Sequence, residues 1–377
     1  MRTSRILTVI GTRPEAIKMA PVVAALRSRG WARVTLLSTG QHRELLDQVL
    51  DAFSLVPDAR LEVMQPNQTL PELTARLTVA IDGYLRENPH DAVLAQGDTT
   101  TVLAAALVAF YHRIPFGHVE AGMRTGDMMR PFPEEMNRVL ASRLARWHFA
   151  ATESCRENLL REGIAPEGIT VTGNTVIDAL HDAVSRIGGK DLAGHGGGVR
   201  QILVTMHRRE SFGEPMREAV RAIRAIADAR QDVRFLFPVH PNPNVRAIVD
   251  EALAGHPRVR LTAPLGYLEF VAAMRDAHLI LTDSGGVQEE APALAKPVLV
   301  LRDETERPEA VREAVVKLVG TSFERIVTEI DALLDDSAAY ARMAQGRSPY
   351  GDGKAARRIA DVLERDLSPS TAGGTRA

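Results

Sequence analysis

Three carboxylates in the first half of the 377-residue chain stand where they could move protons. Asp98 follows one short apolar segment, Glu120 ends the next, and Glu134 comes shortly afterwards. If these segments are neighbouring parallel strands, the three acids leave the same edge of one sheet. Like charges crowded together raise carboxyl pKa values and suit acid–base catalysis. The alternatives are a plain helix N-cap for Asp98 and a first-turn acid for Glu134.

Two other loops have the composition of phosphate-binding turns. Gly11-Thr12-Arg13-Pro14-Glu15 follows the first apolar segment, and Ser284, Gly285 and Gly286 follow a later one. Glycine lets the backbone approach a ligand closely, and a helix N-terminus favours an anion. The first loop has no G-x-G-x-x-G pattern, which argues against a dinucleotide. Glu290, one turn beyond the second loop, could accept hydrogen bonds from ribose hydroxyls. The alternatives are ordinary turns with a surface Arg13 and an exposed Glu290.

Two histidines also follow predicted strands, in the second half of the chain. His207 and Arg208 open a run of four ionisable residues, 207–210, which favours an anion site over a solvated charged turn. His240 lies in a proline-stiffened loop and is either a ligand-facing or a purely structural residue. Cys155, the single cysteine, has no nearby base and is interpreted as structural.

The elements that must position these residues alternate along the chain. Short aliphatic runs predict buried strands, and stretches with apolar residues three and four apart predict helices. The expected strands are 5–10, 33–38, 91–95, 115–119, 147–151, 169–172, 201–205, 233–239, 258–262, 278–282, 297–301 and 316–319. The expected helices of the first half are 14–29, 42–53, 70–87, 99–112, 134–145, 154–162 and 175–187. Strands without strict alternation indicate parallel sheets that are covered on both faces.

This pattern predicts an α/β fold with two doubly wound, Rossmann-like domains that face an interdomain cleft. The first domain is expected at 1–188 and the second at 199–353. A glycine-rich linker is expected at 189–198, and a disordered tail at 369–377. A last helix, 354–368, is expected to join the first domain.

Composition excludes several classes of function. The formal net charge is −2, which argues against nucleic-acid binding and against an anionic membrane surface. The longest apolar run, 102–110, is nine residues and too short to span a membrane. The P-loop lysine, H-E-x-x-H and G-x-S-x-G motifs are absent, and no cluster of metal ligands stands out. We therefore expect a soluble, cytoplasmic protein without a metal or cofactor.

The loops, in this order, resemble the non-hydrolysing UDP-N-acetylglucosamine 2-epimerase family over roughly residues 5–365. The motifs that carry the resemblance are Gly11-Thr12-Arg13-Pro14-Glu15-Ala16-Ile17-Lys18, Gln41-His42-Arg43, Gly97-Asp98-Thr99-Thr100, His118-Val119-Glu120-Ala121-Gly122, Pro133-Glu134-Glu135, Thr172-Gly173-Asn174-Thr175, His207-Arg208-Arg209-Glu210, Pro238-Val239-His240-Pro241-Asn242, Asp283-Ser284-Gly285-Gly286 and Arg307-Pro308-Glu309-Ala310. The resemblance implies the glycosyltransferase-B architecture. It also implies interconversion of UDP-N-acetylglucosamine and UDP-N-acetylmannosamine through a 2-acetamidoglucal intermediate, which would supply precursors of cell-surface polysaccharides.

The resemblance also implies roles for individual residues. The catalytic residues would be Asp98, Glu120, Glu134 and His207. The substrate-binding residues would be Arg13, Lys18, Ser284, Gly285, Gly286 and Glu290. Residues of a site for a second, activating UDP-N-acetylglucosamine would be Gln41, Gln68, Arg208 and His240. The family resemblance further suggests a homodimer.

Small departures from the family pattern leave every proposed catalytic group in place. They are Met206, Asn67, Gln96 and the sequence Pro131-Phe132-Pro133. Asn67, which replaces an Arg of some regulated members, puts the strength of activation in doubt.

Three other functions stay open at the level of the sequence. A retaining glycosyltransferase usually has a second Glu eight residues after the first, but Val298 stands at that position after Glu290. A hydrolysing 2-epimerase would release free N-acetylmannosamine and UDP. A non-catalytic UDP-sugar-binding regulator would tolerate loss of the acids, yet all three are present.

Overall fold

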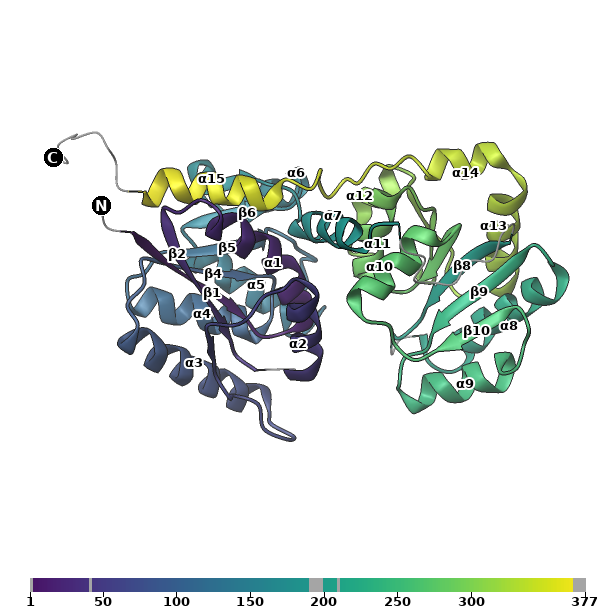
Figure 1. Ribbon diagram of the computed structural model, residues 1–377, viewed down its shortest axis with the longest axis horizontal. Coiled ribbons are helices and arrows are strands. Elements are labelled where there is room, and N and C mark those ends of the chain that lie inside the picture. The colour runs from purple at the N-terminus through teal and green to yellow at the C-terminus, as the bar shows by residue number, and fades with distance from the viewer. Residues whose placement is uncertain (1–2, 41–42, 190–198, 209–210, 369–377) are drawn as a thin grey trace. The chain divides into compact units, whose positions relative to one another are not determined.

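The computed structural model describes residues 3–40, 43–189, 199–208 and 211–368. The chain divides into two compact units, the first made of 1–182 with 350–377 and the second of 183–349 (Figure 1). The division passes inside α7 (Thr175–Ile187), after which Arg275 Nη1 donates to the Gly188 carbonyl oxygen at 2.7 Å. The expected tail, 369–377, and all of the expected linker except Gly189 lie outside the described residues.

The first unit is built on a seven-stranded parallel sheet of order β3-β2-β1-β4-β5-β6-β7. Its strands are β1 (Ser4–Ile10), β2 (Ala32–Ser38), β3 (Ala59–Arg60), β4 (Ala92–Gln96), β5 (Phe116–Ala121), β6 (Trp147–Ala150) and β7 (Ile169–Val171). β4 is buried along its whole length, as expected for a central strand covered on both faces.

Helices cover the faces of this sheet. Besides α7 they are α1 (Arg13–Arg27), α2 (Arg43–Ala52), α3 (Leu70–Glu87), α4 (Thr100–Tyr111), α5 (Glu134–Leu144), α6 (Glu153–Arg161) and α15 (Ala355–Leu367), with a 3₁₀ turn at Pro166–Gly168. α3 shows why they form, because Leu73, Leu77, Ile81 and Leu85 recur every fourth residue and are all buried. They pack with residues of α4 and with Leu7 and other apolar residues of β1 and β4 in one core.

The strand order reverses direction between β1 and β4, since the chain runs outward from β1 through β2 and β3 before it returns to β4. In open parallel sheets, ligands bind beyond the carboxyl ends of the strands at such a reversal. Here those ends lead into the Gly11-Thr12 turn and into Gly97-Asp98, which are two of the loops singled out in the sequence.

The second unit repeats this design with a six-stranded parallel sheet of order β10-β9-β8-β11-β12-β13. The strands are β8 (Arg200–Thr205), β9 (Val233–Pro238), β10 (Val259–Thr262), β11 (Leu279–Thr282), β12 (Val298–Val300) and β13 (Val316–Leu318). The helices are α8 (Glu214–Ala229), α9 (Pro243–Leu253), α10 (Tyr267–Asp276), α11 (Gly285–Glu290), α12 (Pro308–Arg312), α13 (Phe323–Asp335) and α14 (Ser337–Met343), with a 3₁₀ turn at Ala291–Leu294. α8, α9 and α13 share one apolar core with β8 and β9.

In this sheet the order reverses between β8 and β11. The loops after these two strands begin at Met206 and Asp283, so they contain His207 and the Ser284-Gly285-Gly286 turn. Both reversals therefore coincide with residues selected from the sequence for their chemistry.

The C-terminal helix α15 belongs to the first unit (Figure 1). The Asp178 carboxylate caps its start by accepting from the Ala355 and Ala356 N–H groups at 3.1 and 2.9 Å. Near its end, Trp147 Nε1 donates to the Asp366 carboxylate at 2.8 Å. The predicted fold class of two doubly wound parallel sheets is confirmed. Among the helices of the described ranges, none combines the length and apolar character that crossing a membrane requires.

Candidate active site

Asp98 lies in the turn that leads from β4 into α4. His118 Nε2 lies 2.7 Å from the Gly97 carbonyl oxygen, and Asn137 Nδ2 donates to the Asp98 carbonyl oxygen at 2.9 Å. Burial lowers the pKa of His118 to about 3, so the ring is neutral at neutral pH and its Nε2–H donates to the Gly97 carbonyl. Side chains from β5 and α5 thus fix the turn that presents Asp98.

The surroundings of Asp98 raise the pKa of its carboxyl to about 6. Burial is the main cause, and the charges of Glu120 and Glu134 raise this pKa further, while Arg138 and Lys18 oppose them. Because these interactions fall off with distance, they place the three predicted acids in one cluster. With a pKa near 6, a carboxyl can both gain and lose a proton close to neutral pH.

Glu120 is held at the end of β5 by side chains of three other segments. Lys18 Nζ of α1 lies 2.6 Å from its Oε1, Asn174 Nδ2 donates to the same oxygen at 2.7 Å, and the Gln96 amide donates to Oε2. The backbone of Glu120 has φ 65°, and the register of β5 on β6 shifts at this residue. Bulges and left-handed residues of this kind redirect a side chain at functional sites.

Glu134 begins α5, and a buried ion pair follows it within the same helix. Arg138 Nε donates to Glu135 Oε2 at 2.7 Å, and both side chains are almost fully buried. The Glu135 carboxylate also accepts two backbone N–H groups of the preceding loop at 3.0 Å. Arg138 Nη1 lies 3.3 Å from Asp98 Oδ2. The Arg138 guanidinium therefore links Asp98 to Glu135, the residue that holds the preceding loop.

Glu15 shapes the turn between β1 and α1. Its carboxylate accepts from the N–H groups of Gly11 and Thr12 at 2.5 and 2.8 Å and from the hydroxyl of Thr99. Burial raises the pKa of Glu15, although the three donors act against it. Arg13, the first residue of α1, is half-buried beside this turn.

In the second unit, Asp283 joins the loops after β8 and β11. Its carboxylate is fully buried and accepts the N–H groups of His207 and Arg208 at 2.7 and 2.8 Å. Nδ1 of His207 lies 3.1 Å from the other carboxylate oxygen. The His207 ring also stacks on His240, with 6.0 Å between the ring centroids.

The Ser284-Gly285-Gly286 turn opens α11, and Arg307 lies directly against it. A Cβ on Gly285 would come within 3.3 Å of the Arg307 guanidinium carbon, so glycine leaves room for this side chain. Arg307 Nε donates to Glu289 Oε1 at 2.9 Å, which fixes the guanidinium beside the turn. The turn therefore combines small residues with a positive charge.

Glu290, the proposed ribose acceptor, is only 6% exposed. The Tyr267 hydroxyl donates to its Oε1 at 2.9 Å. This contact helps to orient the carboxylate.

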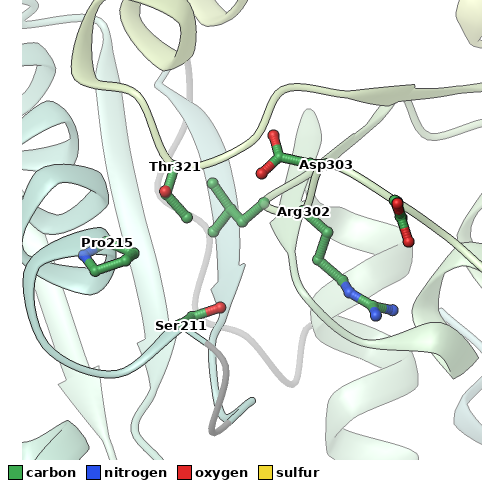
Figure 2. A pocket seen from close by; sticks show the side chains of 7 residues that line it. Ser211, Pro215, Arg302, Asp303 and Thr321 are labelled. Carbon is green, nitrogen blue, oxygen red and sulfur yellow. The ribbon is translucent and has the colours of Figure 1, made fainter. Parts of the chain in front are cut away.

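A pocket of about 430 Å³ opens at the carboxyl edge of the second sheet (Figure 2). It is lined by Ser211, Pro215, Leu301, Arg302, Asp303, Glu304 and Thr321. These residues come from the segment that leads into α8 and from the loops after β12 and β13, and Figure 2 labels Ser211, Pro215, Arg302, Asp303 and Thr321 among them. None of the residues predicted for the active site lines it.

The four residues expected at an activator site are distributed over the chain. Gln68 precedes α3 in the first unit, where its amide oxygen accepts from the Gln65 N–H at 3.2 Å. Arg208 and His240 belong to the loops after β8 and β9 of the second unit. Gln41 lies outside the described residues.

Several residues of these clusters were not singled out for a role in the sequence. They are Glu15, Gln96, Glu135, Arg138, Asn174, Tyr267, Asp283 and Arg307. Five of them, Glu15, Glu135, Asn174, Asp283 and Arg307, lie within the motifs that carry the family resemblance. Membership of a motif was the available signal, because no spacing rule tells which residue of a motif is buried.

Comparison with known proteins gives the family. A family model described as UDP-N-acetylglucosamine 2-epimerase matches residues 24–364. The UDP-N-acetylglucosamine 2-epimerase of Escherichia coli K12 is 51% identical over 371 residues, which cover 96% of this chain and 99% of that protein. The chain belongs to the UDP-N-acetylglucosamine 2-epimerase family. A 2-epimerase is an isomerase that inverts one carbon centre of its sugar, and this is the enzyme class of the chain.

Solved structures agree with this family and with its fold. A UDP-GlcNAc 2-epimerase from Neisseria meningitidis, solved bound to UDP-GlcNAc, is 44% identical and superposes with a TM-score of 0.90 over 96% of this chain and 100% of that one. The glycosyltransferase SnogD from Streptomyces nogalater is 16% identical, with a TM-score of 0.62 over 96% of this chain and 99% of that one. At that identity only the fold is shared, and it is the two-domain glycosyltransferase fold expected from the sequence.

Proposed function

We propose that this epimerase interconverts UDP-N-acetylglucosamine and UDP-N-acetylmannosamine without net release of UDP, as a source of precursors for cell-surface polysaccharides. The observation that carries the proposal is the acid cluster of Asp98, Glu120 and Glu134, with Lys18 and Arg138 among its carboxylates. Sugar transfer alone does not require three acids, whereas removing a proton from one face of a carbon and returning one to the other face calls for proton-transfer groups on both faces.

The chemistry explains why such a cluster is useful. The C2 hydrogen of the sugar is not adjacent to a ketone, so direct removal of this proton is very slow. Elimination avoids a free carbanion at C2: a base takes the C2 proton, the C2–H electrons form the C1–C2 double bond, and the C1–O bond electrons leave with UDP. UDP then adds back to C1 of the 2-acetamidoglucal while a proton is delivered to the opposite face of C2. Atoms balance, and the product differs only at C2.

Within this scheme, the carboxylates of the first unit handle the protons at C2. Asp98 is suited to exchange a proton because its pKa lies near 6. Glu120 has its carboxylate fixed by three donors, including Lys18, so it presents a charge in one direction. Glu134, at the start of α5, is the third member. The face of the sugar that each acid serves is left open in the proposal.

The second unit supplies groups for the leaving diphosphate and for the nucleoside. Ser284, Gly285 and Gly286 would hold phosphate oxygens, with Arg307 beside them. His207 would stabilise the departing diphosphate, and Glu290 would accept hydrogen bonds from the ribose. Arg13 and Lys18 of the first unit would add positive charge toward the same substrate.

The decisive experiment is an NMR incubation of the protein with UDP-N-acetylglucosamine in deuterated water. UDP-N-acetylmannosamine should appear, with deuterium at C2 in both epimers. Accumulation of free N-acetylmannosamine and UDP would instead establish a hydrolysing enzyme. Binding of the sugar nucleotide without exchange would leave a transferase or a regulator as the better account.

Asp98→Asn sharpens this test, because it removes the ionisable group and keeps the shape. We expect exchange to fall by about 10²–10⁴-fold with substrate affinity retained. Asp82→Asn is the matched control, since Asp82 is a carboxylate on α3 that pairs with His112 and Arg86. Equal activity in the two variants would remove Asp98 from the acid–base set.

We also propose that a second UDP-N-acetylglucosamine activates the enzyme through Gln41, Gln68, Arg208 and His240. The support is the resemblance of these positions to the activator site of bacterial members. Starting from pure UDP-N-acetylmannosamine, the reverse reaction should then show a lag that a trace of UDP-N-acetylglucosamine abolishes. A linear progress curve without added activator would contradict this role.

A further inference from the structure

Asp283 is a buried carboxylate between two functional loops of the second unit. Its side chain is 0% exposed, whereas the His207 side chain beside it is 41% exposed. Oδ2 of Asp283 accepts both N–H groups at the start of the His207 loop, from His207 at 2.7 Å and from Arg208 at 2.8 Å. This oxygen is therefore fully used in holding the loop backbone.

The other carboxylate oxygen, Oδ1, is available for the imidazole. It lies 3.1 Å from Nδ1 of His207, and within the described ranges it has no donor at hydrogen-bond geometry. A buried carboxylate oxygen without a donor is costly. A proton on Nδ1 would satisfy this oxygen, and a neutral ring with its proton on Nδ1 carries its lone pair on Nε2.

Asp283 is also ionised near neutral pH. Burial alone would raise the pKa of its carboxyl, but the contact with His207 and the two backbone N–H groups outweigh burial and lower the pKa below its ordinary value. Within the described residues, the charged or titratable neighbours of the ring also include Arg208, next in the chain, and His240, which stacks on it from the loop after β9. Burial and the charge of His207 lower the pKa of His240.

We propose that Asp283 is the positioning residue of His207: it holds the imidazole in the Nδ1–H tautomer, so that Nε2 is the atom that faces the substrate. The role given to Nε2 rests on the proposed function, in which His207 stabilises the departing diphosphate. Nε2 takes up a proton as negative charge develops on the leaving oxygen, and the resulting imidazolium is paired with Asp283. Because Asp283 also precedes the Ser284 turn directly, one carboxylate sets the positions of both loops that would contact the diphosphate.

The isosteric variant Asp283→Asn tests this inference. The amide oxygen can replace Oδ2 and keep both loop hydrogen bonds, while the amide NH₂ replaces Oδ1 and becomes a donor toward Nδ1. His207 must then accept at Nδ1 and carry its proton on Nε2. We expect a folded protein in which kcat falls by about 10²–10⁴-fold, as expected when a carboxylate that orients a catalytic histidine is replaced by its amide.

The tautomer can be read directly by ¹⁵N NMR of the histidine rings, with the His207 signals assigned from a His207→Asn sample. Wild type should show a protonated Nδ1, and Asp283→Asn a protonated Nε2. Asp228→Asn is the matched control, because Asp228 Oδ1 lies 2.9 Å from Nε2 of His256, a pair outside the site. It should change neither kcat nor the His207 signals.

The outcomes separate this inference from the proposed function. If wild-type His207 carries its neutral-state proton on Nε2, the inference is wrong, and this holds even if Asp283→Asn does not fold. It is equally wrong if Asp283→Asn folds and keeps kcat within about threefold of wild type. If the wild-type protein fails to exchange deuterium at C2, the proposed function fails, while the NMR spectrum still reports whether Asp283 sets the tautomer.

Discussion

Glu120 shows how much of an active site is decided at the scale of a single residue. Its left-handed backbone, with φ 65°, costs of the order of 1–3 kcal/mol in a residue other than glycine. This cost is offset by three donors that bind the Glu120 carboxylate and come from α1, β4 and the segment before α7. The sequence predicts an acid at this strand end. It does not predict the donors, because they are distant in the chain and adjacent only in the fold.

Arg138 is predicted to control the ionisation of Asp98. It is almost fully buried, and its positive charge lowers an Asp98 pKa that burial has raised to about 6. Arg138→Gln should therefore shift the Asp98 pKa further upward, by about one to two units, which is about 1.4–2.7 kcal/mol. The ionisation near pH 6 in the kcat/KM profile should move to higher pH. Arg138→Lys keeps a positive charge, so it should move this ionisation less far.

The control for this variant is Arg124→Gln. Arg124 is another nearly buried arginine of the first unit, but it pairs with Glu162. Its loss should reduce stability without moving the ionisation near pH 6. A profile for Arg138→Gln that coincides with the Arg124→Gln profile would show that Arg138 has only a structural role.

The same residues mark the limit of prediction at this scale. Asp98, Glu120 and Glu134 were selected because they follow consecutive strands, and the structure gathers them in one cluster. Glu135 stands beside Glu134 in the sequence, and nothing in the pattern says that it is the buried one. Asp283 occurs in a recognised motif, but its two loop bonds depend on β8 and β11 being neighbours.

At the scale of elements, prediction from the sequence succeeded wherever burial is periodic. The helix expected at 70–87 occurs at Leu70–Glu87, because its apolar residues recur every fourth position and Thr69 with Glu72 forms a capping box. The strand Ala59–Arg60 was not expected. It is only two residues long and has no β-branched residue, and it exists because the edge of β2 pairs with it.

The capping boxes at the starts of α1 and α3 are predicted to differ in energy. Glu15 is a buried acceptor for two N–H groups and the Thr99 hydroxyl, so Glu15→Ala leaves several donors without partners. The free energy of unfolding should fall by about 1–3 kcal/mol, as measured by urea denaturation. Activity should fall as well, since the turn that Glu15 holds contains Arg13.

Glu72→Ala is the natural comparison, because Glu72 occupies the same box position in α3 but is exposed to water. Water can replace the lost carboxylate there, so the loss of stability should be clearly smaller and activity should be unchanged. If the free energy of unfolding falls by the same amount in both variants, then burial does not strengthen the capping box at the start of α1.

At the scale of the whole molecule, the exposed apolar side chains of α3 and α4 predict a self-association face. Val79, Phe110 and Tyr111 are 72%, 59% and 67% exposed on these neighbouring helices. Contiguous apolar exposure usually marks an interface. The double variant Val79→Glu, Phe110→Glu should shift the homodimer that the family resemblance suggests to monomer in sedimentation equilibrium. Val56→Glu, at a residue 75% exposed elsewhere, should not, and a wild-type monomer would contradict the proposal.

The return of the chain to the first unit gives the last prediction. Leu363 of α15 is fully buried in the first unit, and Leu333 of α13 is buried in the second. Each Leu→Ala change should cost about 2–5 kcal/mol through the cavity that it leaves. For Leu363→Ala, native-state hydrogen exchange should show the loss of stability in β1 and α1, although these lie more than three hundred residues away in sequence. For Leu333→Ala, it should show the loss of stability in β8 and α8. If Leu363→Ala instead weakened β8 and α8 as much as β1 and α1, the two units would unfold as one, and α15 would stabilise the chain as a whole rather than the unit it packs on.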